Sequence, residues 1–367
     1  MDSHNFLNDK GIQFFIIVII FLGGLYFGIN FSSTNIDYFS SENPITSEII
    51  SNTNEPNTRD GNDNEFTSKI DILQTNYSYD ELISFALEKI NEDRLSHGIA
   101  PVQLGNNQAA QNHANDMLQY DYFSHWNTNG VKPYVTYTKL GGNAYVQENI
   151  ATSWCEGYGC IMEPKKLIEK AQYAMVYDDA NSNWGHRDNI LDPHHTHVNI
   201  GISFDNSDFY YAQHFENRFF EWIEFSLDDK NNLKIKGETP PGFAINSITI
   251  FQDSLPVSIN GEQIQSIHPY NQRFYDGGEL IGILVEKPDL FGFYEECDNK
   301  KIEISLGGDV FCISYEMYDV ITDEFIFEIT ANMSHWLKLD GIHTIYINLE
   351  SLDGEFVPAT SVTLEFI

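Results

Sequence analysis

The fold is decided by five segments: FSHWN (residues 123–127), ENIA (148–151), GHRDNIL (185–191), VNIGISF (198–204) and FYYAQHF (209–215). The last two are β-rich runs separated by the polar residues 205–208, which is typical of a hairpin. The first three contain the candidate chemical groups His125, Glu148 and His186. The fold and the chemistry are therefore expected to lie together between residues 77 and 217.

Helical periodicity surrounds these segments. Helical spacing of the i, i+3, i+4, i+7 type, shown by Ile83, Ala86, Leu87, Ile90 and Arg94, predicts a helix over about residues 79–98. Two more helices are predicted over about residues 106–120 and 163–180. Helices combined with a short sheet make residues 77–217 an α+β domain.

Residues 218–367 have a different pattern, without any helical segment of strength. They predict a separate all-β domain, an Ig-like β-sandwich, and two smaller sandwiches are the alternative. Turn signals stand at Asn260-Gly261, Asp276-Gly277 and Asp340-Gly341. The candidate strands are 219–225, 232–237, 247–251, 280–286, 301–306, 325–330, 343–349 and 360–366.

The N-terminal part contains an uncharged stretch from Gly11 to Ile36 that is long enough to cross about 30 Å of hydrocarbon as a helix. We predict a transmembrane signal anchor over residues 11–31, preceded by a short cytoplasmic segment, 1–10. A cleaved signal peptide is the alternative, although its apolar core is usually shorter and ends in small residues. Because Lys10 precedes the stretch and the next basic residue is Arg59, the N-terminus is expected inside and the rest outside. This predicts a single-pass protein of the cell membrane.

Residues 32–76 are rich in Ser, Thr, Asn and acids and have no sustained periodicity, so they predict a disordered acidic linker. An exterior location agrees with two short-range cysteine pairs, Cys155 with Cys160 and Cys297 with Cys312, for which local disulfides are the simplest of three connectivities. Asn76 and Asn332 match the N-glycosylation pattern.

The charge of the chain excludes one class of partner. It has 54 Asp and Glu against 20 Lys and Arg, a formal net charge of −34. Nucleic-acid binders neutralise phosphates with clustered Lys and Arg, and the sequence has no such cluster. The acids are interpreted mainly as a solvated surface.

Three residues of the quoted segments could act together: His125, Glu148 and His186. Two imidazoles and a carboxylate suit a divalent metal ion such as Zn²⁺. A single histidine is more often structural, and His113 shares a helical face with Ala110 and Met117, which is typical of a core position. His194, His195 and His197 are expected to be solvated.

Together with Asn91-Glu92-Asp93-Arg94 and HGIAPVQL (97–104), the ordered segments resemble the CAP superfamily of cysteine-rich secretory proteins, antigen 5 and pathogenesis-related proteins, and its prokaryotic branch above all. The resemblance covers about residues 77–217. It implies an α-β-α sandwich whose cleft is lined by two histidines and two acids that can bind a divalent metal. Carried onto this chain, the motifs give His125, Glu148 and His186. The fourth member is less clear, because YAMVYDDANSNWGH offers only Asp178 and Asp179, of which Asp178 is preferred.

Three functions follow as hypotheses, and one of them is a structural envelope protein that takes up no metal. The first is a membrane-anchored extracellular module that holds a metal and binds a lipid, a cell-surface protein or a glycan. The alternative is a metal-dependent or His/Glu-assisted hydrolase of the cell envelope, with Glu148 as general base. The sequence contains neither GxSxG nor HExxH, which favours the binding module.

Overall fold

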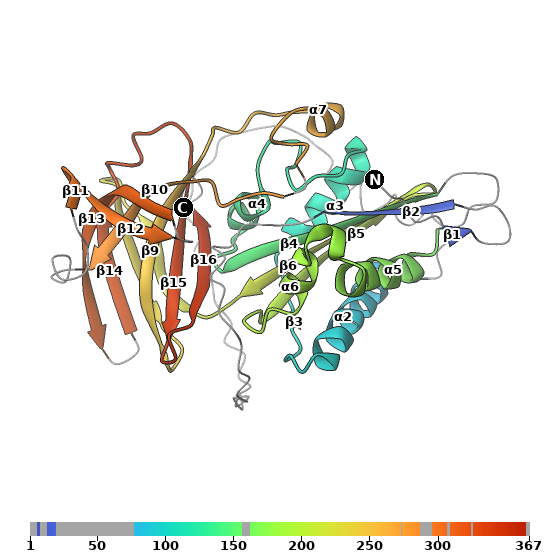
Figure 1. Cartoon of the computed structure of the whole chain (residues 1–367), viewed down its shortest axis with the longest axis horizontal. Coiled ribbons are helices and arrows are strands. Elements are labelled where there is room, and N and C mark those ends of the chain that lie inside the picture. Colours follow the sequence, from blue (N-terminus) through green and yellow to red (C-terminus); the bar gives the residue numbers. More distant parts are fainter. Residues whose placement is uncertain are drawn as a thin grey trace, which may run out of the picture.

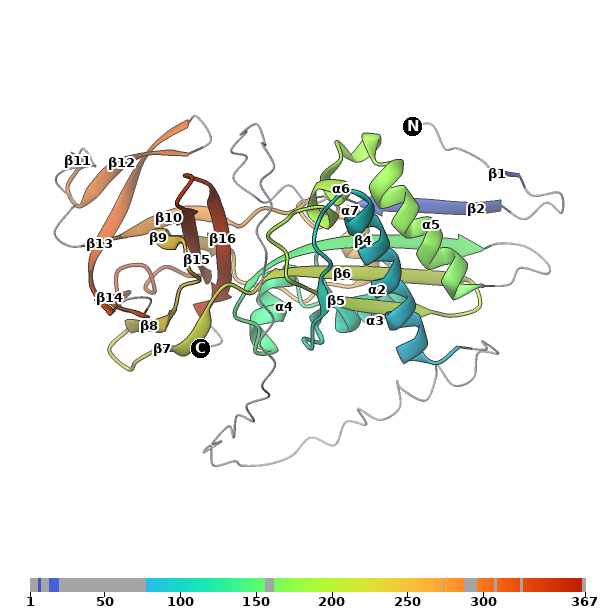
Figure 2. The ribbon, with the colours of Figure 1, turned by 90° about the horizontal axis from the view of Figure 1, so that it is seen from below.

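The computed structural model describes residues 6–7, 13–19, 77–155, 162–272, 274–286, 296–306, 309–323 and 326–364. They form two units, which we call the first unit (residues 77–217, with the two N-terminal strands) and the second unit (residues 218–364). Figures 1 and 2 show the two units side by side along the long axis of the molecule.

The first unit is built on a six-stranded sheet with the order β1-β2-β4-β6-β5-β3. Its centre is antiparallel: β4 pairs with β6, and β6 pairs with β5. The strands are β1 (Phe6–Leu7), β2 (Gln13–Ile19), β3 (Gln103–Leu104), β4 (Tyr145–Cys155), β5 (His197–Phe204) and β6 (Asp208–Asn217). The helices are α2 (Tyr79–Ser96), α3 (Ala109–Tyr120), α4 (Pro133–Lys139), α5 (Pro164–Tyr177), η1 (Ala180–Ser182) and α6 (Gly185–Ile190).

Helices cover both faces of this sheet. The alternation along β6 sends Tyr211 and Phe215 into a core shared with α2 and α5, and sends Tyr210 and Ala212 into a core shared with α3. The N-terminus of α2 is fixed by a capping box between Ser78 and Glu81. The result is a three-layer α-β-α arrangement, as the family resemblance implies, and Figure 1 shows α3 on one side of the sheet and α2 and α5 on the other.

The second unit is strand-rich. Its sheet follows the order β16-β15-β9-β10-β13-β14-β8-β7, and β12 joins β11 to β13. Two parts of this sheet pack against each other, because Ile235 of β8 and Ile329 of β14 share one core with Ile250 of β9 and Ile345 of β15. The strands are β7 (Glu221–Leu227), β8 (Asn232–Glu238), β9 (Phe243–Asp253), β10 (Glu279–Glu286), β11 (Glu296–Asp298), β12 (Lys301–Leu306), β13 (Asp309–Asp323), β14 (Ile326–Asn332), β15 (Ile342–Ser351) and β16 (Phe356–Thr363).

Two features of the second unit differ from the expectation. β13 pairs with β10 in parallel and with β14 in antiparallel orientation, so it belongs to both packed parts, whereas the sheets of Ig domains are antiparallel. The connection between β9 and β10 also contains a helix, α7 (Gly261–Ser266), where none was expected. Asn260 begins it with a capping box to Gln263, so the Asn260-Gly261 pair starts a helix and is not a hairpin turn.

Three predictions concern the N-terminus and the surface. Within the predicted anchor, residues 11–31, the structure describes only β2, and the remaining residues of this stretch and the linker 32–76 lie outside the described residues. None of the described helices has the length and apolar character that a membrane crossing needs. Asn332 is exposed, while Asn76 lies outside the described residues.

The structure describes three of the four cysteines. Cys297 and Cys312 form a disulfide with a Cα–Cα distance of 6.0 Å, which confirms that prediction. Cys155, at the end of β4, is also disulfide-bonded, and Cys160 lies outside the described residues.

A buried histidine and glutamate cluster as candidate metal site

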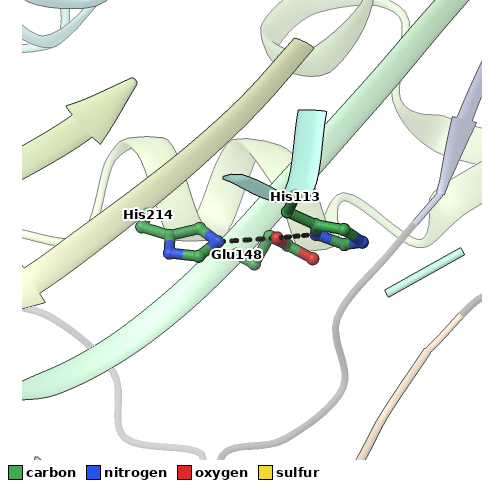
Figure 3. A group of neighbouring side chains, drawn as sticks. All are labelled: His113, Glu148 and His214. Atoms are coloured by element: carbon green, nitrogen blue, oxygen red, sulfur yellow. Dashed lines mark hydrogen bonds and ion pairs between the residues drawn. The ribbon is translucent and has the colours of Figure 1, made fainter. Parts of the chain in front are cut away.

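Glu148 lies in the middle of β4 and has no exposed surface. Its Oε2 atom lies 2.6 Å from Nδ1 of His113 and 2.6 Å from Nε2 of His214, and its Oε1 atom lies 2.7 Å from Nδ1 of His125. The carboxylate therefore accepts three hydrogen bonds, one from each imidazole. Figure 3 shows His113 and His214 on opposite sides of Glu148. We call these four residues the Glu148 cluster.

The elements of the first unit explain why these side chains meet. Glu148 and His214 are directly opposite in the antiparallel pairing of β4 with β6, so they share one face of the sheet. His113 projects from α3, which covers this same face. α3 ends at Asp121, in the left-handed conformation with φ of 50°, and the following turn brings His125 back over the sheet. One side chain from each of four chain segments therefore reaches the cluster.

Charge interactions outweigh burial at two members of the cluster. Burial alone would raise the pKa of Glu148, but the charge of His113 and the hydrogen bonds from His113, His125 and His214 hold it well below its ordinary value. Burial opposes protonation of His113, yet the Glu148 carboxylate raises the pKa of this imidazole. Burial dominates at His125 and lowers its pKa. The cluster thus keeps an ionised carboxylate in the protein interior beside one imidazole, His113, whose pKa is raised.

Three members of the cluster form a group that can hold a metal ion. His113, Glu148 and His214 each offer a ligand atom, and these atoms lie within 4.8 Å of one another. Nε2 of His113 and Nδ1 of His214 are buried and have no hydrogen-bond partner among the described residues. These two nitrogens are on the far side of each ring from Glu148, so the atoms available to an ion at the cluster are Nδ1 of His113 and Nε2 of His214. Two imidazole nitrogens and a carboxylate oxygen are a donor set that fits Zn²⁺.

His186 occupies a neighbouring position. Its Nδ1 atom lies 2.7 Å from Oδ1 of Asp179, whose other oxygen accepts from the backbone N–H of His186 at 2.9 Å. The side chain of Asn149, next to Glu148, donates to the carbonyl of His186 at 3.2 Å. His186 is close enough to His125 for its charge to lower the pKa of that imidazole. α6 is therefore fixed beside the cluster, although His186 binds Asp179 and not Glu148.

The structure places the predicted site residues as follows. His125 and Glu148 are in direct contact, and His186 lies nearby. Asp178, the preferred fourth acid, is exposed at the end of α5, and Asp179 makes the contact with His186. The chain turns at the end of α5, so Asp178 faces solvent and Asp179, the next residue, faces the interior.

Two residues of the cluster were not chosen from the sequence. His113 was assigned to the core, and it is buried as expected, but its ring also binds Glu148. His214 has one signal in the sequence, since the alternation of FYYAQHF puts it on the same face as Tyr210 and Ala212. The strand register that sets it opposite Glu148 is not visible in the sequence. His195 was expected to be solvated, but it is 3% exposed.

A segment of the second unit touches the cluster. The Tyr275 hydroxyl accepts a hydrogen bond from the backbone N–H of Glu148 at 3.3 Å, and its ring lies 4.9 Å from that of His125 between centroids. His113 is 5% exposed, and His125 and His214 are each 1% exposed. The cluster is therefore closed to solvent.

Comparisons with known proteins concern the first unit. Residues 87–215 match the model of the Cysteine-rich secretory protein family (CAP). No curated protein matches the chain. Among solved structures, the chain is similar to an extracellular protein containing a SCP domain from Bacillus anthracis, with 20% identity and a TM-score of 0.28, over 40% of this chain and 45% of that one. It is also similar to the CAP domain of Enterococcal PrgA, with 14% identity and a TM-score of 0.25, over 42% and 70%. The match spans less than half of the Bacillus anthracis chain.

Proposed function

We propose that the chain, whose residues 87–215 match the CAP family model, is an extracellular CAP-domain binding module whose Glu148 cluster holds one divalent metal ion. The observation that carries this proposal is the convergence of His113 and His214 on a single buried carboxylate oxygen. In this assignment His113, Glu148 and His214 supply the ligands. A bound ion would supply positive charge that offsets the buried carboxylate.

His125 has a different role in the proposal. It donates to Oε1 of Glu148, the oxygen that His113 and His214 leave free. Partners of this kind fix the orientation of a ligating carboxylate, and their loss typically lowers metal affinity by about 10–100-fold. His125 is therefore a positioning residue, and Tyr275 contributes by fixing the backbone N–H of Glu148.

The closed environment favours binding over catalysis. Structural metal sites are enclosed by protein, whereas catalytic sites keep a position open for water or substrate. The side chains of His125 and Glu148 are both 0% exposed. The hydrolase alternative, with Glu148 as general base, requires access that this conformation does not give.

The location of the module is part of the same proposal. The apolar stretch 11–31 would anchor the chain in the cell membrane with the N-terminus inside, and the acidic segment 32–76 would tether the two units outside. Disulfide-bonded Cys155, Cys297 and Cys312 agree with an oxidising exterior compartment. A lipid, a cell-surface protein or a glycan would be the ligand of the module, with the second unit as a further contact surface.

Glu148→Gln tests the metal site. The amide keeps the shape of the side chain but removes the charge and weakens the ligand oxygen, so we expect Zn²⁺ affinity to fall by at least about 100-fold, the upper range for a perturbed site. Equilibrium dialysis of the purified full-length protein against Zn²⁺ measures this directly. Glu88→Gln, an exposed acid on α2, is the matched control and should bind as the unmodified protein does. Equal Zn²⁺ binding by both variants would refute the assignment of Glu148.

A further inference from the structure

Residues 254–278 form a long connection between β9 and β10, which we call the strap; residue 273 lies outside the described part. β9 and β10 are antiparallel neighbours in which Gln252 lies opposite Glu279. A two-residue turn is enough to connect strands in this arrangement. Connections between neighbouring elements in compact domains have a median length of about 4–6 residues, so the strap is unusually long even though it contains α7. Figure 1 shows α7 of the strap beside the first unit, away from the strands that it connects.

A single lysine of the first unit holds both ends of the strap. Nζ of Lys132 lies 2.6 Å from Oδ1 of Asp253, where β9 ends, and 2.7 Å from Oδ1 of Asp276, just before β10. It also donates to the carbonyl of Asp276 at 3.0 Å, and the hydroxyl of Tyr134 donates to the other oxygen of Asp253. Lys132 is 7% exposed, and its contact with Asp253 is largely shielded from water, whereas the side chain of Asp276 is 71% exposed. The ammonium group of Lys132, from the first unit, thus holds the two ends of the strap together.

The body of the strap packs on the first unit as protein interior. Ile264 of α7 is 0% exposed and lies in one cluster with Met117, Tyr122 and Tyr210. α7 approaches so closely that a Cβ atom on Gly261 would lie 1.9 Å from the carbonyl oxygen of Tyr120.

Hydrogen bonds follow the same path along the strap. The backbone N–H of Ile259 donates to the carbonyl of Thr128 at 2.9 Å, and the side chain of Gln265 donates to the carbonyl of Asp121 at 2.6 Å. The hydroxyl of Ser124 donates to the carbonyl of Tyr270 at 2.6 Å. The acceptors and donors on the first unit all lie in the segment that carries His125.

The strap also reaches the Glu148 cluster itself. Tyr275 is 1% exposed and packs with Trp126 and Tyr134, while its hydroxyl and ring contact Glu148 and His125. Tyr270 adds an edge contact to Trp126, with ring centroids 6.2 Å apart. Aromatic side chains of the second unit therefore form part of the wall around the cluster.

From these contacts we infer that the strap is a lid, supplied by the second unit, which closes the Glu148 cluster and controls the exchange of its metal ion. The inference deepens the proposed metal site and rests on it for the ion that is exchanged. The ion pairs of Lys132 and the buried packing of Ile264 keep the lid in its closed position. Loosening either one opens a path to the cluster and leaves the ligands in place.

Lys132→Met and Ile264→Asn test the lid. The first removes the ammonium group that binds both ends of the strap, and the second places a polar side chain in the apolar contact between α7 and the first unit. Leu255→Asn is the matched control, because Leu255 lies on the strap but is 56% exposed. Full-length protein loaded with Zn²⁺ is mixed with excess chelator, and the rate of Zn²⁺ release is followed. We expect release to be at least about tenfold faster in the two variants than in the control, as for any site behind a locally opening segment.

Histidine modification by diethyl pyrocarbonate, read by mass spectrometry on metal-free protein, gives a second measurement that does not depend on the ion. His125 and His113 should react faster in both variants, and His335, which is exposed, sets the reference rate. His195 is buried and contacts Asn189 and Asn217, so it should stay protected unless the whole unit unfolds. Unchanged release and unchanged modification in both variants would overturn the lid while leaving the metal site intact. Faster modification without any Zn²⁺ binding would retain the lid and overturn the metal site.

Discussion

His195 shows at the scale of one residue how the first unit handles buried polar groups. Its ring is stacked on Phe215 and contacts Asn217 at 2.6 Å and Asn189 at 2.8 Å, so both nitrogens have partners. Burial lowers the pKa of this imidazole to about 4. The neutral ring is therefore part of the folded structure over most of the pH range.

This pKa predicts a pH dependence of stability. An unfolded chain protonates His195 near pH 6.5, whereas the folded protein does so only near pH 4, so the unfolded state binds more protons in between. The stability that the folded protein gains from the neutral His195 is fully present above pH 6.5, decreases as the pH falls toward 4, and does not change further below pH 4. Its size is about 3 kcal/mol, at 1.36 kcal/mol for each unit of pKa.

His195→Gln should remove this dependence. Denaturant unfolding at pH 7, 5.5 and 4.5 gives the free energy of unfolding of the variant and of the unmodified protein, and we expect the difference between them to shrink as the pH falls. His335→Gln, at an exposed position, should show no such trend. A difference that stays constant across these pH values would contradict the neutral, buried state of His195.

Single residues also show how far sequence reasoning reaches. Glu148 and His125 could be chosen because their segments are distinctive, and the structure brings them into contact. His214 could not, since its relation to Glu148 depends on a strand register between residues that are far apart in sequence. Asp178 and Asp179 are neighbours at the turn after α5, where one side chain faces solvent and the other faces the interior. The local sequence does not determine which of the two faces inward.

At the scale of elements, one buried side chain of α2 forms hydrogen bonds with the segment at and after the end of α6. Arg94 has no exposed surface and donates to the carbonyls of Ala100, Ile190, Asp192 and His195. Burial lowers the pKa of its guanidinium group to about 10, so it is charged at neutral pH. It thereby positions the segment between His186 and β5.

Arg94→Met should be strongly destabilising. The variant keeps an apolar chain of similar length but leaves four carbonyl groups without their donor, which costs about 1–3 kcal/mol for each buried group left unpaired. We expect a loss of about 3–5 kcal/mol, typical of removing a buried charge from its partners. Thermal or denaturant unfolding measures it, with Lys89→Met on the partly exposed face of α2 as the control, which should cost under about 1 kcal/mol. Similar losses in both variants would contradict the role of Arg94.

The elements that the sequence predicts best are those with a long, regular period. α2, α3 and α5 and the hairpin of β5 and β6 agree with the predicted ranges to within a few residues. The short helices α4, α6 and α7 have too few turns to show a helical period, and the Asn260–Gln263 capping box of α7 was a readable signal that was interpreted as a turn. β13 was missed because its alternation includes charged and exposed positions.

At the scale of the whole molecule, the two units share more than a linker. Besides the strap, β16 contacts the first unit: Thr360 donates to the carbonyl of Asn143 at 2.8 Å, and the side chain of Asn217 donates to the carbonyl of Pro358 at 2.8 Å. The change of period along the sequence predicts a division between residues 77–217 and 218–367, but nothing in the pattern indicates that the β9–β10 connection returns to the Glu148 cluster. Contacts between distant segments depend on the assembled fold and not on local pattern.

The most direct test of the central claim is the Zn²⁺ content of two double variants of the full-length protein, measured by elemental analysis after loading and dialysis. His113→Gln/His214→Gln removes the two ligands assigned from the geometry, and His125→Gln/His186→Gln removes the two histidines implied by the family resemblance. We predict about one Zn²⁺ per chain in the unmodified protein, loss of the ion in the first variant, and retention with weaker affinity in the second. An ion that stays in the first variant and is lost in the second would contradict the assignment, as would an unmodified protein that takes up none.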